Sequence, residues 1–306
     1  GQNYSIPVAV AGPGAELNCL LLEYTLDATG ASSSPSIIYE WSTPNGNILS
    51  GTNTINPVVD EPGTYTILVL DTANGCSSTA SVVITQDANQ PISDAGPQQT
   101  LTCDVTSLSL NGTASSVGPQ YSYNWVTSNG NIVSGGNTLT PEIDQPGVYQ
   151  LEVFDQSNNC TVISAVEILQ DIQAPNIGIA LPETLSCVVL QTQIDASGSS
   201  SGTDFSYEWQ TTNGELVAGS TTLQPTVASP GLYTLVVTNT DNGCTSTSFI
   251  TVEEDITDPD VAVSVPGLLT CAIQDLVISA LGTSQGSEFT YLWSTADGQL
   301  LSPPST

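Results

Sequence analysis

The chain has 306 residues and contains no Lys, Arg, His or Met, and its 30 Asp and Glu residues give it a net charge of −30. Without a basic surface the sequence excludes electrostatic binding of nucleic acid, and it argues against docking on anionic lipid. The absence of His, Lys and Arg also removes most catalytic chemistry, so we expect no catalytic residues. A pair of carboxylates for glycoside hydrolysis is the remaining enzymatic alternative, but the acids form no distinctive cluster.

One stretch of sequence occurs four times, and equivalent residues of successive copies keep one constant spacing along the chain. A fixed period of this kind indicates a tandem array of one structural unit. Asp-x-x-x-Pro segments mark the boundaries and predict repeats at 1–86, 87–170 and 171–254, followed by a partial repeat at 255–306. The residues that mark the register are Trp41, Trp125, Trp209 and Trp293, the first cysteines Cys19, Cys103, Cys187 and Cys271, and the second cysteines Cys76, Cys160 and Cys244.

Within each repeat, apolar and polar residues alternate with the period of a β-strand. In the second copy, Tyr121, Tyr123 and Trp125 share one face and predict the central core strand. The Asn129-Gly130 pair that follows predicts a tight hairpin, because Asn-Gly supplies two residues that tolerate positive φ.

Another strand is expected toward the end of each repeat. In the second copy it follows a Pro-Gly turn and places Tyr149, Leu151 and Val153 on its buried face. About seven short strands per repeat, with turn signals between them and no convincing helix, predict an all-β fold. We expect tandem antiparallel β-sandwich domains arranged as an elongated rod.

The cysteines predict one disulfide per repeat. Each complete copy has two cysteines at the same spacing, which pairs Cys19 with Cys76, Cys103 with Cys160 and Cys187 with Cys244. A bridge that closes such a loop stabilises the fold by roughly 4 kcal/mol in the chain-entropy model. At the same spacing, the partner of Cys271 falls beyond the end of the chain. Paired cysteines predict an oxidising, extracellular compartment; buried free thiols are the alternative.

Four segments of the second copy carry a family resemblance. They are Asp94 to Pro97, Leu110 to Ser116, Tyr121 to Trp125 and Pro146 to Val153. These segments resemble the polycystic-kidney-disease (PKD) domain and its bacterial Ig-like relatives. The regular copies, the cysteine pair and the segment Thr127 to Gly135 look like the tandem repeats of giant surface adhesins or fibres that gliding bacteria export by the type IX system. The resemblance implies Ig-like domains that act as spacers or scaffolds.

Acidic residues gather at the predicted repeat boundaries, most densely at the third. Calcium takes six to eight oxygen ligands from carboxylates and carbonyls, so the third boundary is a candidate calcium site, and Asp87 and Asp171 mark weaker candidates at the other two. The alternative is a solvated acidic linker in which the Asp caps a turn. No other cofactor is expected. The candidate ligands at the third boundary are Glu253, Glu254, Asp255, Asp258 and Asp260.

Glycan attachment is a second candidate modification. Asn3, Asn111 and Asn159 match the N-linked acceptor pattern. Thr72 fits the O-linked acceptor pattern that the family resemblance suggests. Chance matches are the alternative, because the chain is rich in Asn, Ser and Thr.

Together these features predict a structural, non-enzymatic extracellular or cell-surface protein region, which forms the stalk or shaft of a bacterial surface adhesin or multi-chain fibre. The expected partners are other copies of the chain, and glycans or cell surfaces bound by regions outside it. We expect neither nucleic acid nor membrane insertion. The alternatives are a calcium-dependent carbohydrate-binding module array and a non-catalytic spacer of a secreted polysaccharide-degrading enzyme.

Overall fold

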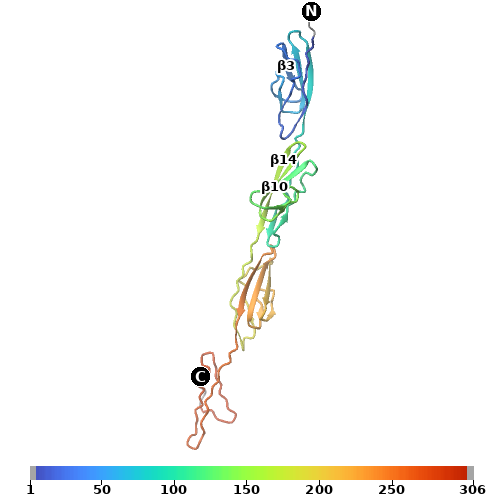
Figure 1. Ribbon diagram of the computed structural model, residues 1–306. Coiled ribbons are helices and arrows are strands. Elements are labelled where there is room, and N and C mark those ends of the chain that lie inside the picture. Colours follow the sequence, from blue (N-terminus) through green and yellow to red (C-terminus); the bar gives the residue numbers. More distant parts are fainter. Residues whose placement is uncertain (1–4, 302–306) are drawn as a thin grey trace. The chain divides into compact units, whose positions relative to one another are not determined.

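The computed structural model describes residues 5–301, and this part of the chain contains strands but no helix (Figure 1). Accordingly, no helix able to cross a bilayer occurs among residues 5–301. The chain divides into two compact units, Gly1–Ala174 with Asn239–Cys244, and Pro175–Thr238 with Thr245–Thr306. The predicted all-β class is confirmed.

Each of the first three repeats contributes seven strands, as predicted. The first repeat has β1 (Ala15–Leu17), β2 (Tyr24–Thr25), β3 (Ile37–Ser42), β4 (Ile48–Ser50), β5 (Val58–Val59), β6 (Gly63–Asp71) and β7 (Ser77–Gln86). The second has β8 (Gln99–Thr102), β9 (Leu108–Ser109), β10 (Tyr121–Thr127), β11 (Ile132–Ser134), β12 (Glu142–Ile143), β13 (Gly147–Asp155) and β14 (Cys160–Asp171). The third has β15 (Leu185–Ser186), β16 (Thr192–Gln193), β17 (Phe205–Thr211), β18 (Leu216–Ala218), β19 (Thr226–Val227), β20 (Gly231–Asn239) and β21 (Thr245–Val252), and β22 (Glu254–Asp255) follows it.

In the first two repeats the strands form two sheets that face one another across a core, and the third repeat has the sheets β17-β20-β21 and β16-β19-β18 with β15-β22 as a separate pair. In the first repeat the sheets have the orders β1-β7-β6-β3 and β2-β5-β4, and in the second β10-β13-β14-β8 and β11-β12-β9. Most pairings are antiparallel, as expected. The first strand of each repeat differs, because β1 runs parallel to β7, β8 to β14 and β15 to β22. The sandwiches are therefore mixed rather than purely antiparallel.

The residues predicted to form the core are buried. Trp125 on β10 is 3% exposed and its Nε1 donates to the carbonyl oxygen of Thr138 at 2.9 Å. Tyr149, Leu151 and Val153 on β13 are fully buried. The same positions are buried in the other two repeats, which is why the Trp and Tyr recur in register: Trp41, Tyr65, Ile67 and Val69 in the first, and Trp209, Tyr233, Leu235 and Val237 in the third.

The hairpin predicted at Asn129-Gly130 is wrong. Strand β10 pairs with β13, and the chain passes through this turn into β11 of the opposite sheet. Neither turn residue has positive φ. Glycine is required here because a Cβ on Gly130 would collide with the ring and hydroxyl of Tyr149. The turn is therefore shaped by close packing against a buried tyrosine.

The described part of the expected fourth repeat lacks the strands of the other three. Between residues 256 and 301 the structure shows one isolated bridge, Leu281 to Thr283. Trp293 is only half-buried. This segment contains no counterparts of β6 and β7, which contribute Tyr65, Ile67, Val69, Val82 and Ile84 to the core of the first repeat.

We predict that the buried tyrosines make the fold sensitive to alkali. Burial raises the pKa of Tyr149, and likewise of Tyr65 and Tyr233. A raised folded-state pKa contributes stability that is present below the unfolded pKa of about 10 and is lost as pH rises through the folded value. Guanidinium unfolding of a Tyr65→Phe, Tyr149→Phe, Tyr233→Phe variant should show weaker loss of stability above about pH 10 than the wild type.

At neutral pH the same triple variant should be less stable. The Tyr149 hydroxyl donates to the carbonyl oxygen of Gln145 at 2.6 Å and accepts from the backbone N–H of Asn131 at 3.0 Å. Loss of such bonds costs about 1–3 kcal/mol per site. Tyr123→Phe, which removes one hydroxyl bond to the Ser116 carbonyl, is the control for this cost. An identical pH slope in the triple variant and the wild type would contradict the prediction.

Candidate functional site

The disulfides join successive repeats, and the predicted pairing within each repeat is wrong. Cys19 is bonded to Cys160 and Cys103 to Cys244, each across a sequence separation of 141 residues. The predicted pairs Cys19–Cys76, Cys103–Cys160 and Cys187–Cys244 do not form. Cys76, Cys187 and Cys271 are free thiols. Each bond therefore links the first cysteine of one repeat to the second cysteine of the next.

The parallel first strand explains this pairing. Leu17 at the end of β1 lies opposite Gln86 at the end of β7, so Cys19 lies beyond the end of β7. Cys76 lies just before the start of the same strand. At about 3.3 Å per residue, β7 holds the two cysteines roughly 30 Å apart. A disulfide needs Cα atoms within about 7 Å, so the two cysteines of one repeat cannot meet.

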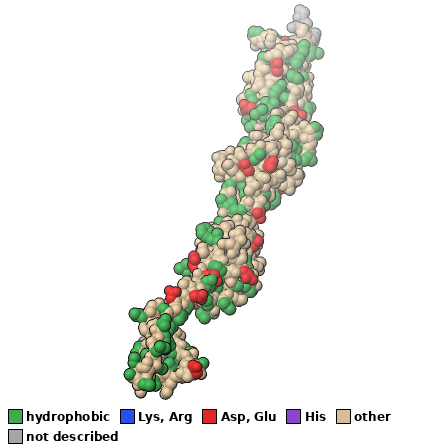
Figure 2. Space-filling view, turned by 60° about the horizontal axis from the view of Figure 1, so that its bottom comes forward, with side chains coloured by type: hydrophobic (Ala, Val, Ile, Leu, Met, Phe, Trp, Pro, Cys, Tyr) green, Lys and Arg blue, Asp and Glu red, His purple; other side chains and the backbone are tan. Residues whose placement is uncertain are grey.

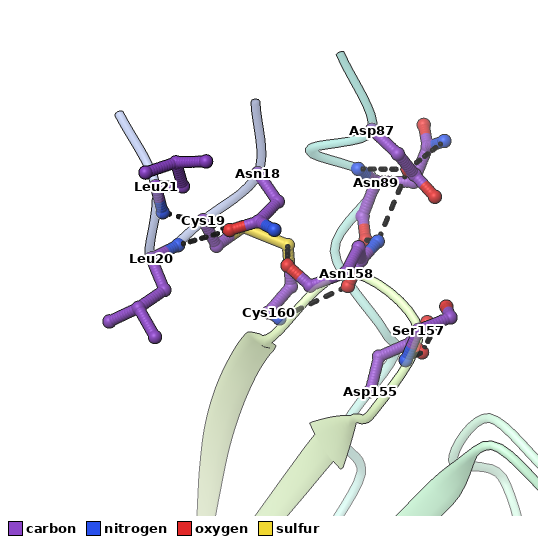
Figure 3. Close-up of a disulfide and its surroundings, with 10 residues drawn as sticks. All are labelled: Asn18, Cys19, Leu20, Leu21, Asp87, Asn89, Asp155, Ser157, Asn158 and Cys160. Atoms are coloured by element: carbon purple, nitrogen blue, oxygen red, sulfur yellow. Dashed lines mark hydrogen bonds between the residues drawn. A yellow bond between two sulfur atoms is a disulfide. The ribbon is translucent and has the colours of Figure 1, made fainter. Parts of the chain in front are cut away.

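We call the contact between the Cys19 turn, the linker at residues 87–89 and the Cys160 turn the first joint. It is centred on Asn158, which is 2% exposed (Figure 3). Its carbonyl oxygen accepts from the backbone N–H of Cys19 at 3.3 Å, and its Oδ1 accepts from that of Cys160 at 3.0 Å. Its Nδ2 donates to Asp87 Oδ1 at 3.2 Å and to the carbonyl oxygen of Asn89 at 2.9 Å. The buried side chain of Asn158 thus holds the linker, and the backbone carbonyl of the same residue binds the Cys19 turn of the preceding repeat.

The Cys19 turn is itself held in shape by its own residues. The Oδ1 of Asn18 accepts from the backbone N–H groups of Leu20 at 3.0 Å and Leu21 at 2.8 Å (Figure 3). The backbone N–H of Asn18 donates to the carbonyl oxygen of Leu21 at 3.0 Å. These bonds place the cysteine at the tip of a closed turn, where it can reach the next repeat.

The second joint repeats the first contact by contact. Asn242 is 2% exposed, its carbonyl oxygen accepts from Cys103 N at 3.0 Å, and its Oδ1 accepts from Cys244 N at 2.9 Å. Its Nδ2 donates to Asp171 Oδ1 at 2.9 Å and to the Gln173 carbonyl oxygen at 3.1 Å. All five residues belong to the same compact unit.

A left-handed residue precedes the second cysteine of each repeat. The φ angles are 74° at Gly75, 57° at Asn159 and 70° at Gly243. Glycine and asparagine are the residues that tolerate this conformation most readily. The motif Asn-Gly-Cys or Asn-Asn-Cys therefore encodes the turn. Sequence reasoning missed it, although the Asn two residues before the cysteine is present in all three copies.

The boundary aspartates act as hydrogen-bond acceptors in the linkers. Asp87 Oδ1 accepts from the backbone N–H of Asn89 at 3.2 Å, and this bond, with help from Asn158, lowers the pKa of Asp87. Asp171 Oδ1 accepts from Gln173 N at 3.2 Å. At Asp255 the corresponding bond from Thr257 lowers the pKa of the carboxyl group. These contacts match the alternative in which the aspartate caps a turn.

The calcium candidates do not form a ready-made site. Glu253, Glu254, Asp255, Asp258 and Asp260 are all exposed. In the part of the chain that the structure describes, no group of three or more Asp, Glu, His or Cys side chains is arranged to hold a metal ion. Calcium binding at the third boundary, and at Asp87 and Asp171, therefore stays a prediction.

The glycan candidates lie in different environments. Asn111 and Thr72 are exposed, and Thr72 Oγ1 donates to the Ser36 carbonyl oxygen at 2.8 Å. Asn159 is half-buried in the turn beside the first disulfide. Asn3 lies outside the described residues. Modification of these residues also stays a prediction.

The disulfides indicate in which cellular compartment the chain resides. Such bonds persist in oxidising surroundings and are rare in the cytosol. Both disulfides join successive β-sandwich repeats. The chain is therefore an extracellular or cell-surface protein region.

Comparison with known proteins finds partial relatives. No family model matches the chain. The human dyslexia-associated protein KIAA0319 is 29% identical over 277 residues, and its mouse homolog is 27% identical over 276. Each match covers 80% of this chain and 26% of the relative, so the chain spans about a quarter of the length of these relatives. The relatives are mammalian, and the bacterial origin that the sequence resemblance implies is not confirmed by them.

Solved structures with several consecutive domains are also similar. The I-band fragment I67-I69 of titin has a TM-score of 0.40 at 12% identity and covers 83% of this chain and all of that fragment. Protocadherin Gamma B7 extracellular cadherin domains 1–4 give 0.30 at 13% identity, covering 81% of this chain and 76% of that one. The eight N-terminal Ig domains of Down Syndrome Cell Adhesion Molecule give 0.33 at 11%, covering 83% and 42%. At these scores the superpositions carry no argument about this chain's function.

We predict that Asn158→Ala loosens the first joint while the disulfide stays intact. The variant leaves Cys160 N and the linker acceptors without their partner, at a cost of about 1–3 kcal/mol. Hydrogen exchange at residues 18–21 and 87–89 should become roughly 5- to 150-fold faster. Asn74→Ala is the matched control, because it removes the equivalent side chain from a turn on which no cysteine turn is docked. Equal effects of the two variants on these amides would show that Asn158 does not hold the joint.

Proposed function

We propose that the chain is a load-bearing segment of an extracellular stalk or fibre, in which the offset disulfides give the first two junctions between repeats a second covalent connection. The observation that supports this is the pairing of Cys19 with Cys160 and of Cys103 with Cys244. The two disulfide-closed loops overlap between residues 103 and 160. A single cut of the backbone anywhere between residues 19 and 244 would therefore leave the two sides joined by a disulfide.

The disulfides also limit extension. Without them, the fully extended chain between Cys19 and Cys244 would reach roughly 790 Å, at about 3.5 Å per residue. With them, the shortest covalent path crosses from Cys19 to Cys160, returns along the chain to Cys103 and crosses to Cys244. The extended length of this path is only roughly 200 Å.

The strand geometry places this load in shear. In the second repeat, force enters at Cys160, where β14 starts, and leaves at Cys103, directly after β8. The two strands are parallel, and their pairing runs from Ile168 and Gln99 to Asp171 and Thr102. Opposed pulls along parallel strands load all of their hydrogen bonds together, whereas peeling would break them one at a time.

The surface chemistry fits an extracellular spacer. Figure 2 shows acidic side chains scattered among uncharged polar ones, and the chain has no basic residue. A high net charge of one sign keeps a protein soluble and disfavours non-specific association. The resemblance to the surface proteins of gliding bacteria supports placing the stalk on a bacterial cell. The carbohydrate-binding alternative lacks support, because among the described aromatic residues only Phe249 is exposed and the rest are buried or half-buried.

A single cut in the linker tests the second connection. A protease site inserted between Ala88 and Ile92 should allow cleavage while the oxidised chain remains one covalent species on a denaturing gel. Addition of reductant should then release two fragments. A Cys19→Ser, Cys160→Ser variant is the control and should separate after cleavage without reductant. Separation of the oxidised wild type into two fragments would overturn the proposal.

Single-molecule stretching tests the extension limit. We expect the oxidised chain, held at its two ends, to reach a maximum length about 600 Å shorter than a variant with Ser at positions 19, 103, 160 and 244, because the disulfides bypass most of the backbone path between Cys19 and Cys244. Equal contour lengths in the two proteins would show that the disulfides do not carry the load.

A further inference from the structure

We propose that the six Asn-Gly pairs of the chain are sites of hydrolytic deamidation that the folded repeats protect and that react when a repeat opens. Asparagine before glycine is prone to this reaction, because glycine has no Cβ that would hinder the approach of its backbone nitrogen to the asparagine side chain. The protection comes from hydrogen bonds within single repeats and does not depend on the load-bearing role. The six asparagines are Asn45, Asn74, Asn111, Asn129, Asn213 and Asn242.

The reaction consumes water and needs no other reactant. The backbone nitrogen of the glycine attacks the side-chain Cγ of the asparagine, its proton leaves with the amide nitrogen as ammonia, and a succinimide ring closes. Water then adds to one of the two ring carbonyl groups and breaks the bond from that carbonyl carbon to the ring nitrogen. Opening at Cγ gives Asp, and opening at the main-chain carbonyl gives iso-Asp, in which the main chain runs through the side-chain methylene group.

The turn after the Trp strand holds both reacting groups in the second repeat. The backbone N–H of Gly130, which would attack, donates to Thr127 Oγ1 at 3.0 Å. The Asn129 side chain, which would be attacked, is directed toward β13, because its Oδ1 accepts from the backbone N–H of Val148 at 3.0 Å. The Thr127 hydroxyl is fixed in turn, since it donates to the Val148 carbonyl oxygen at 2.8 Å. Attack therefore requires this set of bonds to open.

The first and third repeats hold their equivalent pairs in the same way. In both, the glycine N–H donates to a threonine hydroxyl at 2.9 Å, and the asparagine Oδ1 accepts from a strand N–H at 3.0 Å. The threonine two residues before the asparagine is thus part of the protection in all three turns. The residues are Thr43, Asn45, Gly46 and Thr64 in the first repeat, and Thr211, Asn213, Gly214 and Leu232 in the third.

The other three pairs are held by backbone acceptors. In each, the glycine N–H donates to a main-chain carbonyl oxygen at 2.7 or 2.8 Å. The asparagine Oδ1 accepts from the backbone N–H two residues later, at 2.8 to 3.2 Å. All six pairs therefore have the attacking N–H and the side-chain oxygen bonded. The carbonyl acceptors are Asp71 for Gly75, Leu139 for Gly112 and Asn239 for Gly243.

Deamidation of the folded chain must therefore pass through opened conformations. Where opening is fast and rare, the observed rate is the rate of the free peptide multiplied by the open fraction. Asp is compatible with the turn, because Asp297 occupies the equivalent position of the fourth copy and Gly298 N donates to Thr295 Oγ1 at 2.8 Å. Iso-Asp lengthens the main chain of the turn by a methylene group and displaces the groups that the bonds join. A repeat that stays open thus acquires a permanent change.

The first test compares native and unfolded protein. The oxidised full chain is incubated at mildly alkaline pH, with and without guanidinium. Each pair is followed by mass spectrometry of peptides cut after aromatic residues and leucine, because the chain offers no Lys or Arg to trypsin. Each Asn-Gly pair should deamidate at least about tenfold more slowly in the native chain than in the unfolded chain, since the open fraction is small. Equal rates in the two samples would overturn the proposal.

A single substitution separates local protection from general stability. Thr127→Val removes the hydroxyl that accepts from Gly130 N, so deamidation of Asn129 in the native chain should become about tenfold faster. Asn111 lies in the same repeat but is bonded to Thr113, and it should keep its rate. Thr127→Ser keeps the hydroxyl and should restore the wild-type rate at Asn129.

Thr138→Val is the matched control, because it removes a hydroxyl of the same repeat that donates to the Gly135 carbonyl oxygen at 2.8 Å. It should leave the rate at Asn129 unchanged. The proposal is overturned by a wild-type rate at Asn129 in Thr127→Val, by equal acceleration at Asn129 and Asn111 in that variant, or by serine and valine variants that react equally fast. Acceleration by Thr138→Val to the level of Thr127→Val would also overturn it.

Discussion

The parallel pairing of the first and last strands of each repeat is the constraint on which the rest of the structure depends. It places the first cysteine at the end of the repeat where the chain leaves and the second cysteine at the opposite end. Neither can reach the other, and each comes within bonding distance only of a neighbouring repeat. Had β1 run antiparallel to β7, Cys19 would have lain near Cys76, and the cysteines would have closed each domain separately.

The absence of cations shapes how the joints are held. A chain with Lys or Arg could bind a linker carboxylate with a charged donor, but no such residue is available here. Instead, the Nδ2 of Asn158 donates to the carboxylate of Asp87, and the Nδ2 of Asn242 donates to that of Asp171. An amide also supplies an acceptor from the same side chain, which the backbone N–H of the cysteine two residues later fills. Burial of a neutral amide with its bonds satisfied avoids the desolvation cost of a buried ion pair.

The repeat period allowed the β-sandwich core to be predicted from the sequence, but not the disulfide pairing between repeats. Trp125 and Tyr149 recur in every complete copy because each fills a buried position, so the alternation around them predicts the core strands correctly. The same regularity hides the disulfide pairing, since a fixed period is equally compatible with partners in one copy and with partners in successive copies. Only the direction of β1 decides between them, and a three-residue strand carries no signal of direction. Asn158 was within reach of sequence reasoning, because Asn-x-Cys occurs in all three copies.

Stability alone does not distinguish the two pairings. In the chain-entropy model, closing the longer loop between repeats rather than the shorter loop within one adds only about 0.8 kcal/mol. The difference is topological. Disulfides within each repeat would leave the peptide linker as the single covalent connection at every junction, so the segment from Asp87 to Gln99 would carry the whole load and one cut there would part the chain. The offset bonds bridge that segment, and under the proposed load the force would pass through the folded region between Cys103 and Cys160, where β8 and β14 pair in parallel. In the proposed load-bearing role, the observed pairing therefore reinforces the first two junctions and makes the folded second repeat, which holds both Cys103 and Cys160, the element that bears force.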